Sequence, residues 1–238
     1  MTWSIVARDA DGAFGVAVAS RAFAVGALCP YARSGVGALS TQALVNPHYA
    51  TPGLDLLSQG TPPDEVLRLL TGPDEGRDHR QLHMVDARGR TAAYTGAKCV
   101  DWCGHLTKAD VTVAGNMLAG PKVIEATMQR YDESAQLTFA QRLITALAEG
   151  ERQGGDKRGK QGAALLIFTT ESYPFLDLRV DDHVDPIVEL ERLYEKSFER
   201  YQALLACLPS RACPSGVTDR GEVEASIARF QAQRSGER

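Results

Sequence analysis

The sequence contains no apolar run approaching about 18 residues, the length that a membrane-spanning helix needs. It also lacks a basic segment followed by an apolar one near its start, the pattern of a secretory signal peptide. No block of like charge interrupts its 26 basic and 30 acidic residues, whose net charge is −4. We therefore expect a cytoplasmic protein with no nucleic-acid partner and no membrane partner.

Cysteine is scarce, and its odd number, five in 238 residues, favours free thiols over a disulfide framework. Three residues separate Cys99 from Cys103, and His105 follows. A zinc site usually needs a second ligand pair, and His79 and His83 fall in a segment with loop and strand character. A zinc site or a cysteine nucleophile with a histidine base stays open, but we favour a packed thiol pair. We expect no metal and no cofactor.

Alternating polar and apolar residues predict strands from the start of the chain. Residues 3–8 and 13–20 are expected to form a hairpin around the turn "DADG" at 9–12. Further strands are expected at 35–43, 81–86, 90–94, 109–115, 163–169 and 176–181. After a loop at 46–53, helices are expected around Leu54–Leu57 and at 61–72, 121–134, 138–153, 186–207 and, weakly, 221–233. Because βαβ alternation is absent, this α+β order favours two antiparallel sheets packed face to face with helices outside.

The first strand begins at the second residue, in "MTWSIVARD", and that residue is a threonine. A strand starting at Thr2, a tight hairpin and a second strand ending in Ser20-Arg21 resemble the opening of N-terminal-nucleophile hydrolases, which include proteasome β subunits. The chain is similar in particular to domain-of-unknown-function family 1028. That resemblance rests on the order of "TWSIVARD", "GVAVASRAFAVG", "GVGALSTQALVNPHY", "YTGAKCVDWCGH", "VAGNMLAGPKV", "GGDKRGKQGAALLI" and "LRVDDHVDPIVEL".

The resemblance implies a four-layer αββα sandwich of two antiparallel sheets. It spans residues 2 to about 200, so we expect a domain at 1–208 that is similar to the N-terminal-nucleophile hydrolases. Residues 209–238 are expected to form a polar tail, partly helical or disordered. The predicted helix at 186–207 could pack a homo-oligomer, although we slightly prefer it as the outer layer of a monomer.

A threonine hydroxyl needs a base to become a nucleophile. If Met1 is removed, the α-amine of Thr2 can serve as that base, because α-amines have pKa values of about 7.7–8.0. The resemblance then implies an amide hydrolase in which Thr2 attacks a small linear amide. Arg21, at the end of the second strand, could hold a carboxylate or lower the amine pKa. Asn116, after a later strand, is a suitable oxyanion donor.

Other polar residues stand where a substrate could be bound. Gln42 follows a buried run, and Asn46 lies in the loop after it. The glycine-rich loop "GGDKRGKQG" adds Asp156, Arg158 and Gln161, without the spacing of a nucleotide-binding loop. Together with Arg21, this loop favours a small carboxylate-bearing amide as the substrate.

The chain also departs from the proteasome pattern. Ala19 stands where those proteins have an aspartate, and no lysine occurs between Thr2 and Lys98. The alternative is therefore a non-catalytic protein that uses the same fold for ligand binding or assembly.

Overall fold

The computed structural model describes residues 2–236. Its internal contacts divide the chain into unit 1, Met1–Leu190, and unit 2, Glu191–Arg238, which we describe separately. The domain boundary expected at residue 208 lies inside unit 2 and stays a prediction. Within residues 2–236, no helix is both long enough and apolar enough to cross a membrane.

Unit 1 is built on two antiparallel sheets. The six-stranded sheet has the order β10-β9-β2-β1-β8-β7, so the first strand of the chain lies near its centre. Its members are β1 (Thr2–Arg8), β2 (Phe14–Ser20), β7 (Gly104–Lys108), β8 (Val111–Asn116), β9 (Gly162–Phe168) and β10 (Leu176–Val180). The four-stranded sheet has the order β3-β4-β5-β6. It contains β3 (Pro30–Arg33), β4 (Gly37–Ala43), β5 (Arg80–Asp86) and β6 (Thr91–Thr95).

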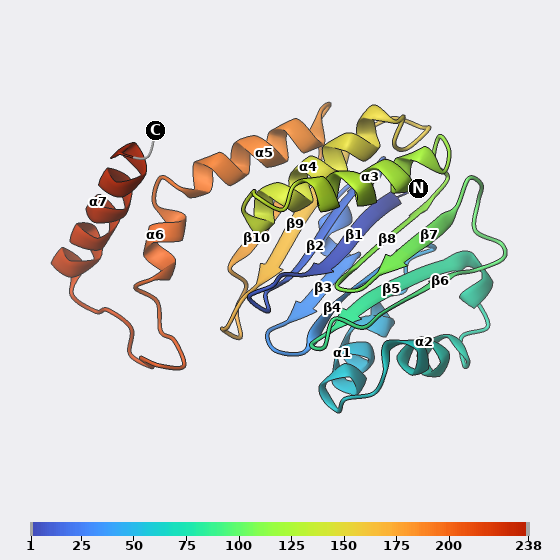
Figure 1. Cartoon of the computed structure of the whole chain (residues 1–238), viewed down its shortest axis with the longest axis horizontal. Helices are drawn as coiled ribbons and strands as arrows, with labels where there is room; N and C mark the ends of the chain where they lie inside the picture. Colours follow the sequence, from blue (N-terminus) through green and yellow to red (C-terminus); the bar gives the residue numbers. More distant parts are fainter. Residues whose placement is uncertain (1, 237–238) are drawn as a thin grey trace. The chain divides into compact units, whose positions relative to one another are not determined.

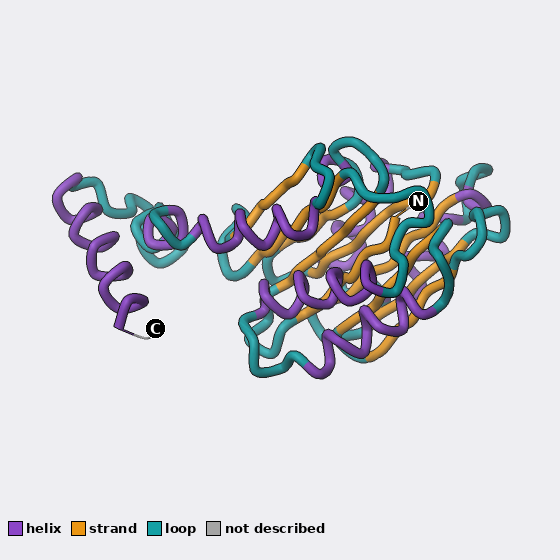
Figure 2. The backbone as a smooth tube through the Cα atoms, turned by 90° about the horizontal axis from the view of Figure 1, so that it is seen from above, coloured by secondary structure: helices purple, strands orange, loops and turns teal. Residues whose placement is uncertain are grey.

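Helices cover the outer face of each sheet, which confirms the expected four-layer αββα sandwich (Figure 1). The helices α3 (Lys122–Glu133) and α4 (Phe139–Arg152) pack on the six-stranded sheet. The helices α1 (Ala50–Ser58) and α2 (Pro63–Thr71) pack on the four-stranded sheet. Seen from above, the strands run side by side beneath a helical layer (Figure 2). Short 3-10 turns occupy η1 (Val25–Ala27), η2 (Pro47–Tyr49) and η3 (Arg77–His79).

Residue size and alternation explain how the layers meet. Gly15 in β2 lets α4 approach closely, because a Cβ at this position would lie 2.5 Å from Leu143 Cδ1. Under the four-stranded sheet, apolar residues such as Leu39, Leu57 and Met84 form a core with α1 and α2. Between the sheets, a second apolar cluster forms at the end of the strands remote from Thr2; it contains Val6, Phe14, Val16, Ala38 and Val85.

The structure corrects several sequence-based expectations. The strands β3 and β7 were not expected, and both lie at sheet edges. The predicted loop at 46–53 is wrong, because η2 occupies Pro47–Tyr49 and α1 already begins at Ala50. The single helix expected at 186–207 is also wrong. It is interrupted between α5 (Pro186–Ser197) and α6 (Tyr201–Leu205), and Arg200 there has a non-helical φ of −145°.

Unit 2 holds the end of α5 together with α6 and α7 (Arg220–Gly236), where a weaker helix was expected at 221–233. Phe198 stacks on Phe230, and the Arg234 guanidinium lies 3.5 Å from the Phe198 ring centroid. An ion pair between Arg200 and Glu224 adds a second contact to α7. Aromatic and cation–π contacts therefore hold the helices of this unit together.

Candidate functional site

A group of buried polar side chains lies between the two sheets, at the end of the sandwich where β1 begins. Alternation along each strand places them on the inner faces, since residues i and i+2 of a strand share a face. We call this group the polar stripe; it consists of Thr2, Ser4, Ser20, Ser40, Gln42, Gln81, His83 and Asn116. All eight are at least 94% buried, so each has to find its hydrogen-bond partner within the protein.

Thr2 stands at the edge of this stripe, in the middle of the six-stranded sheet. It pairs with Ser20 of β2 on one side and with Asn116 of β8 on the other. Its hydroxyl donates to Ser20 Oγ over 3.1 Å. Its carbonyl oxygen lies 3.4 Å from both Gln42 Nε2 and Asn116 Nδ2. Strand pairing and side-chain amides thus hold the Thr2 backbone from three strands.

Gln81 of β5 connects these amides. Its Oε1 accepts from Gln42 Nε2 at 2.9 Å and from Asn116 Nδ2 at 2.8 Å. Its Nε2 donates to the Gly115 carbonyl at 2.8 Å and to Thr95 Oγ1 at 3.0 Å. The two sheets are therefore joined by a network of three side-chain amides, two of which contact the Thr2 carbonyl.

Ser4 and His83 continue the polar stripe away from Thr2. Ser4 Oγ lies 2.7 Å from His83 Nε2 and 2.7 Å from Gln42 Oε1. Burial is the main cause that lowers the pKa of His83 to about 3, with a smaller contribution from His105. The imidazole is therefore neutral near pH 7, and it acts as a neutral hydrogen-bonding group.

Arg21 and the glycine-rich loop form a second cluster beside Ser20. The Arg21 backbone N–H donates to Asp156 Oδ2 at 2.8 Å, and its Nη1 donates to the Arg158 carbonyl at 2.7 Å. Asp156 also pairs with the Arg158 guanidinium at 3.2 Å. Gln161 donates its backbone N–H to the Ser20 carbonyl and its side-chain amide to Asp182. The loop is thereby tied to the end of β2, while Arg21 itself stays exposed.

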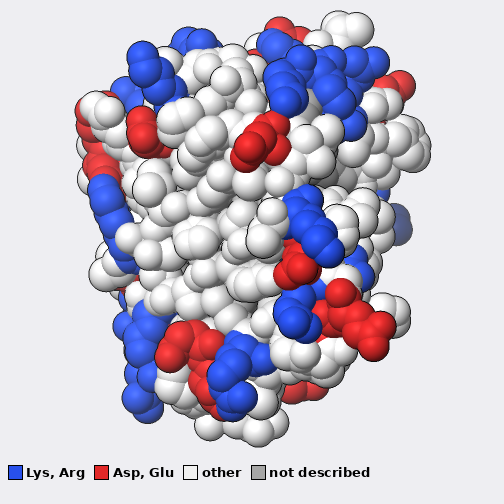
Figure 3. Space-filling model, turned by 90° about the vertical axis from the view of Figure 1, so that its right-hand side faces the viewer, with Lys and Arg blue, Asp and Glu red and all other residues white. Residues whose placement is uncertain are grey.

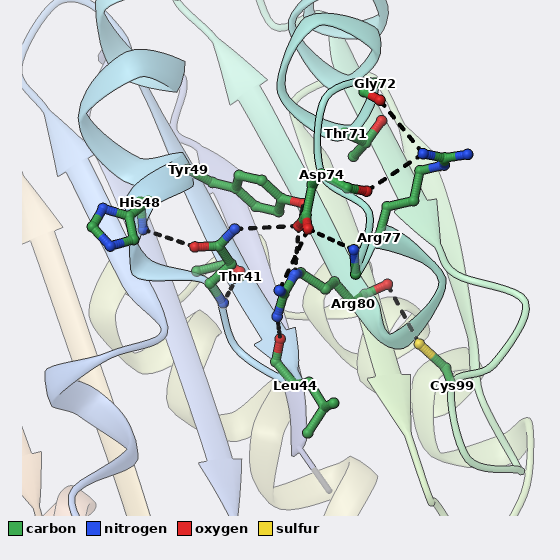
Figure 4. A network of polar contacts seen from close by, with 12 residues as sticks. Thr41, Leu44, His48, Tyr49, Thr71, Gly72, Asp74, Arg77, Arg80 and Cys99 are labelled. Atoms are coloured by element: carbon green, nitrogen blue, oxygen red, sulfur yellow. Dashed lines mark hydrogen bonds and ion pairs between the residues drawn. The ribbon is translucent and has the colours of Figure 1, made fainter.

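Asn46 belongs to a third cluster, which lies beyond the end of β4 and includes Asp74. Asp74 and its other partners, Tyr49 and Arg80, are shown in Figure 4. Asn46 Nδ2 lies 3.3 Å from Asp74 Oδ2, which also accepts from Tyr49 Oη and, over 2.5 Å, from Arg80 Nε. Arg80 is the main cause that holds the pKa of the Asp74 carboxyl well below its usual range. Burial, followed by the neighbouring Asp74, raises the pKa of Tyr49. Asn46 Oδ1 accepts from the His48 backbone, so this residue organises the loop between β4 and α1.

The cysteine segment shows no activated thiol. Burial raises the pKa of Cys99 to about 11 and also raises the pKa of Cys103. His105 Nδ1 lies 2.9 Å from Thr95 Oγ1. Within residues 2–236, no group of three or more His, Cys, Asp or Glu side chains is placed to hold a metal ion.

Comparison with known proteins places the chain in a family. A family model described as "Family of unknown function (DUF1028)" matches residues 2–190, which covers nearly all of unit 1. The chain belongs to this DUF1028 family. The search of curated proteins found no match.

A solved structure agrees with this DUF1028 membership. The crystal structure of protein SPO2555 from Silicibacter pomeroyi, described with the DUF1028 family model, is 33% identical and has a TM-score of 0.85. The match covers 92% of this chain and 96% of that one. Anbu, an ancestral beta-subunit from Yersinia bercovieri, is 13% identical over 87% of this chain and 98% of its own, with a TM-score of 0.38. That likeness is too low to bear on fold or function.

The structure brings some expected site residues together and leaves others apart. Thr2, Gln42 and Asn116 share one network, Arg21 lies beside it with the glycine-rich loop, and Asn46 binds Asp74 instead. Sequence reasoning missed Gln81. A sequence pattern could have predicted it, because β1, β4 and β5 each carry two polar residues at positions i and i+2 inside a buried strand.

Proposed function

We propose that this protein is an N-terminal-nucleophile amide hydrolase whose nucleophile is Thr2, freed by removal of Met1. The observation that carries the proposal is the setting of Thr2 in a central strand. Its buried hydroxyl is held by Ser20 Oγ at 3.1 Å, and its carbonyl is held by two side-chain amides. A nucleophile fixed by packing and hydrogen bonds keeps its reactive geometry.

The base in this proposal is the α-amine of Thr2 itself. An α-amine has a pKa of about 7.7–8.0, so a useful fraction is neutral near pH 7–8. Histidine is not needed for this role, and the low pKa of buried His83 makes it a poor base. Removal of Met1 therefore supplies both the free amine and the access to Oγ1.

The reaction proceeds in two balanced steps. Thr2 Oγ1 attacks the amide carbonyl while the α-amine takes the hydroxyl proton. The C–N bond of the tetrahedral intermediate then breaks, and the resulting ammonium returns the proton to the departing amine. This leaves an ester on Thr2, which water hydrolyses by the same route. Asn116 Nδ2, whose contact with the Thr2 carbonyl is long at 3.4 Å, is our proposed oxyanion donor.

Substrate binding is assigned to the exposed groups around Thr2. Arg21 follows Ser20 directly and its side chain is exposed, so in this proposal its guanidinium would bind a substrate carboxylate. Asp156, Arg158 and Gln161 would fix the loop beside it.

Gln42 and Asn46 have separate supporting roles in this proposal. Gln42 would support Thr2 from the opposite sheet through its contact with the Thr2 carbonyl. Asn46 would shape the adjoining loop, in which its side chain caps the turn that begins at Pro47.

A non-catalytic role in ligand binding or assembly is the second candidate. The observation that favours it is the closed amide network, because Gln42, Gln81 and Asn116 satisfy one another as structural side chains do. In that case the polar stripe would only align the two sheets. Turnover experiments on Thr2 separate the two candidates.

The test begins with the intact mass of the active protein, which should lack Met1. A library of small linear amides should then identify hydrolysis that Thr2→Ala abolishes and that Thr170→Ala, an exposed matched control, preserves. Inserting one glycine between Met1 and Thr2 keeps the hydroxyl but moves the amine, so activity should fall as far as in Thr2→Ala. Full activity with Met1 retained, or in Thr2→Ala, would overturn the proposal.

A further inference from the structure

Exposed apolar side chains gather at the end of unit 1 where β1 begins. Single exposed apolar residues are common on protein surfaces, but a group of them marks an interaction site. We call this group the apolar collar; it consists of Phe23, Leu28, Leu44, Val100 and Val184, which are 46–87% exposed. They come from four separate loops, so their shared location results from the fold and not from one apolar segment.

Three members of the collar flank Thr2 through neighbouring strands. Phe23 follows three residues after Ser20, the β2 partner of Thr2. Leu44 follows two residues after Gln42, which reaches the Thr2 carbonyl from the other sheet. The Val100 carbonyl accepts from the backbone N–H of Met117 at 2.8 Å, directly after Asn116 of β8.

Two further members complete the collar on the β2 side. The residue after Leu28 accepts a backbone hydrogen bond from Thr41, beside Gln42. Val184 follows His183, whose N–H donates to the Gln161 carbonyl, and Gln161 in turn donates to Ser20.

Figure 3 shows the right-hand side of the Figure 1 view, with a broad uncharged area in the middle and most Lys, Arg, Asp and Glu side chains around it. A substrate covering that area would therefore meet mostly uncharged surface.

We propose that the substrate is an N-acyl amino acid whose acyl chain is long and apolar. This inference rests on the proposed function, in which Thr2 attacks the amide and Arg21 binds the carboxylate. The carboxylate and the acyl chain lie on opposite sides of the amide. A carboxylate on Arg21, on the β2 side of Thr2, therefore directs the acyl chain across Thr2 towards Leu44 and Val100 of the collar. A small polar amide would leave these apolar side chains in water, and a second copy of the chain seated on them would close access to Thr2.

The inference predicts an affinity that grows with chain length. Burial of one CH₂ group tightens binding by up to about fourfold. Because the collar is open to solvent, we expect about two- to fourfold for each added methylene until the chain extends past it. The contact between Arg21 and the carboxylate should instead raise the affinity by the same factor for every acyl-chain length.

The experiment measures binding without turnover, by calorimetry on Thr2→Ala. N-acetylglycine, N-hexanoylglycine and N-decanoylglycine should bind with rising affinity. Adding Phe23→Ser and Leu44→Ser should weaken N-decanoylglycine at least tenfold and leave N-acetylglycine unchanged. The matched control Leu69→Ser, an exposed leucine on α2, should have no effect, and Arg21→Gln should weaken all three ligands equally. Should the double variant melt early, Val100→Ser replaces it.

The outcomes separate this inference from the proposed function. If affinity grows with acyl-chain length but the wild-type protein hydrolyses none of the compounds, the apolar collar is supported and the role of Thr2 as nucleophile is overturned. Hydrolysis of the acetyl and decanoyl compounds with equal kcat/KM would support the nucleophile and overturn the collar. Sedimentation showing a dimer that Phe23→Ser and Leu44→Ser dissociate would also overturn it, since a second copy would then occupy this surface.

Discussion

Acidification should destabilise this protein through one buried histidine. His83 is fully buried between the sheets, with Ser4 Oγ 2.7 Å from its Nε2. Burial is the main cause that lowers its pKa to about 3, whereas an exposed histidine in the unfolded chain titrates near 6.5. Between these two values, the unfolded chain binds one proton more than the folded chain. The free energy of unfolding therefore falls as the pH decreases through this window, and the contribution is complete above about pH 6.5.

The size of the effect follows from the same window. One pH unit corresponds to about 1.4 kcal/mol for one proton. From the unfolded pKa near 6.5 down to about pH 5 is roughly 1.5 units, so the folded state should lose about 2 kcal/mol. For a chain of this length, that loss lowers the Tm by about 4–8 °C. The other shifted histidine, His105, has its pKa lowered by burial as well, so it acts in the same direction.

Urea unfolding at pH 7 and pH 5 tests the prediction. The control is His48→Gln, which alters an exposed histidine. Between pH 7 and pH 5, the free energy of unfolding of the wild type and of this control should each fall by about 2 kcal/mol more than that of His83→Gln. Because each protein is compared with itself at two pH values, any general cost of the substitution cancels, as does the contribution of His105. Equal losses in all three proteins would refute the assignment of the acid sensitivity to His83.

Three further substitutions should lower stability in urea or thermal unfolding. Asp74→Asn should cost about 3 kcal/mol at pH 7 by breaking a partly buried ion pair, and the cost should shrink below about pH 4, where the carboxyl of the unfolded chain is protonated. Gly15→Ala should cost about 1–3 kcal/mol, because its Cβ would lie 2.5 Å from Leu143 Cδ1, and a stabilised variant would contradict this packing. Thr138→Ala should cost about 1 kcal/mol by removing the capping box of α4, and an unchanged Tm would exclude that role.

Alternation and capping made most of this fold predictable. The buried strand β1 alternates polar and apolar residues over its first half, β2 and β9 are almost continuously apolar, and α4 begins at a threonine cap. The edge strands β3 and β7 were not predicted because they lack such a pattern. β3 has four residues and begins at Pro30, which an edge strand tolerates, and β7 is mostly exposed or half-buried.

The candidate site was harder to predict, because its contacts depend on how the two sheets align. The sequence indicated Thr2, Gln42 and Asn116 as polar residues in or after buried strands. Gln81 connects them only because β5 pairs with β4 so that Gln81 lies opposite Gln42. Neither that register nor the stacking of β1 over β4 follows from one strand alone. The pairing of His83 with Ser4 was hidden for the same reason.

The position of the polar stripe separates stability from function. Buried polar groups cost free energy unless they are hydrogen-bonded, and an apolar filling of similar volume is often at least as stable. The same strands contain that alternative farther along, since β1, β4 and β5 place Val6, Ala38 and Val85 between the sheets. If stability were the only requirement, apolar residues would also fill the space between the sheets at the end where Thr2 lies. The chain instead concentrates polar residues beside Thr2, which is the expected distribution when that end serves a site and the remainder serves the core.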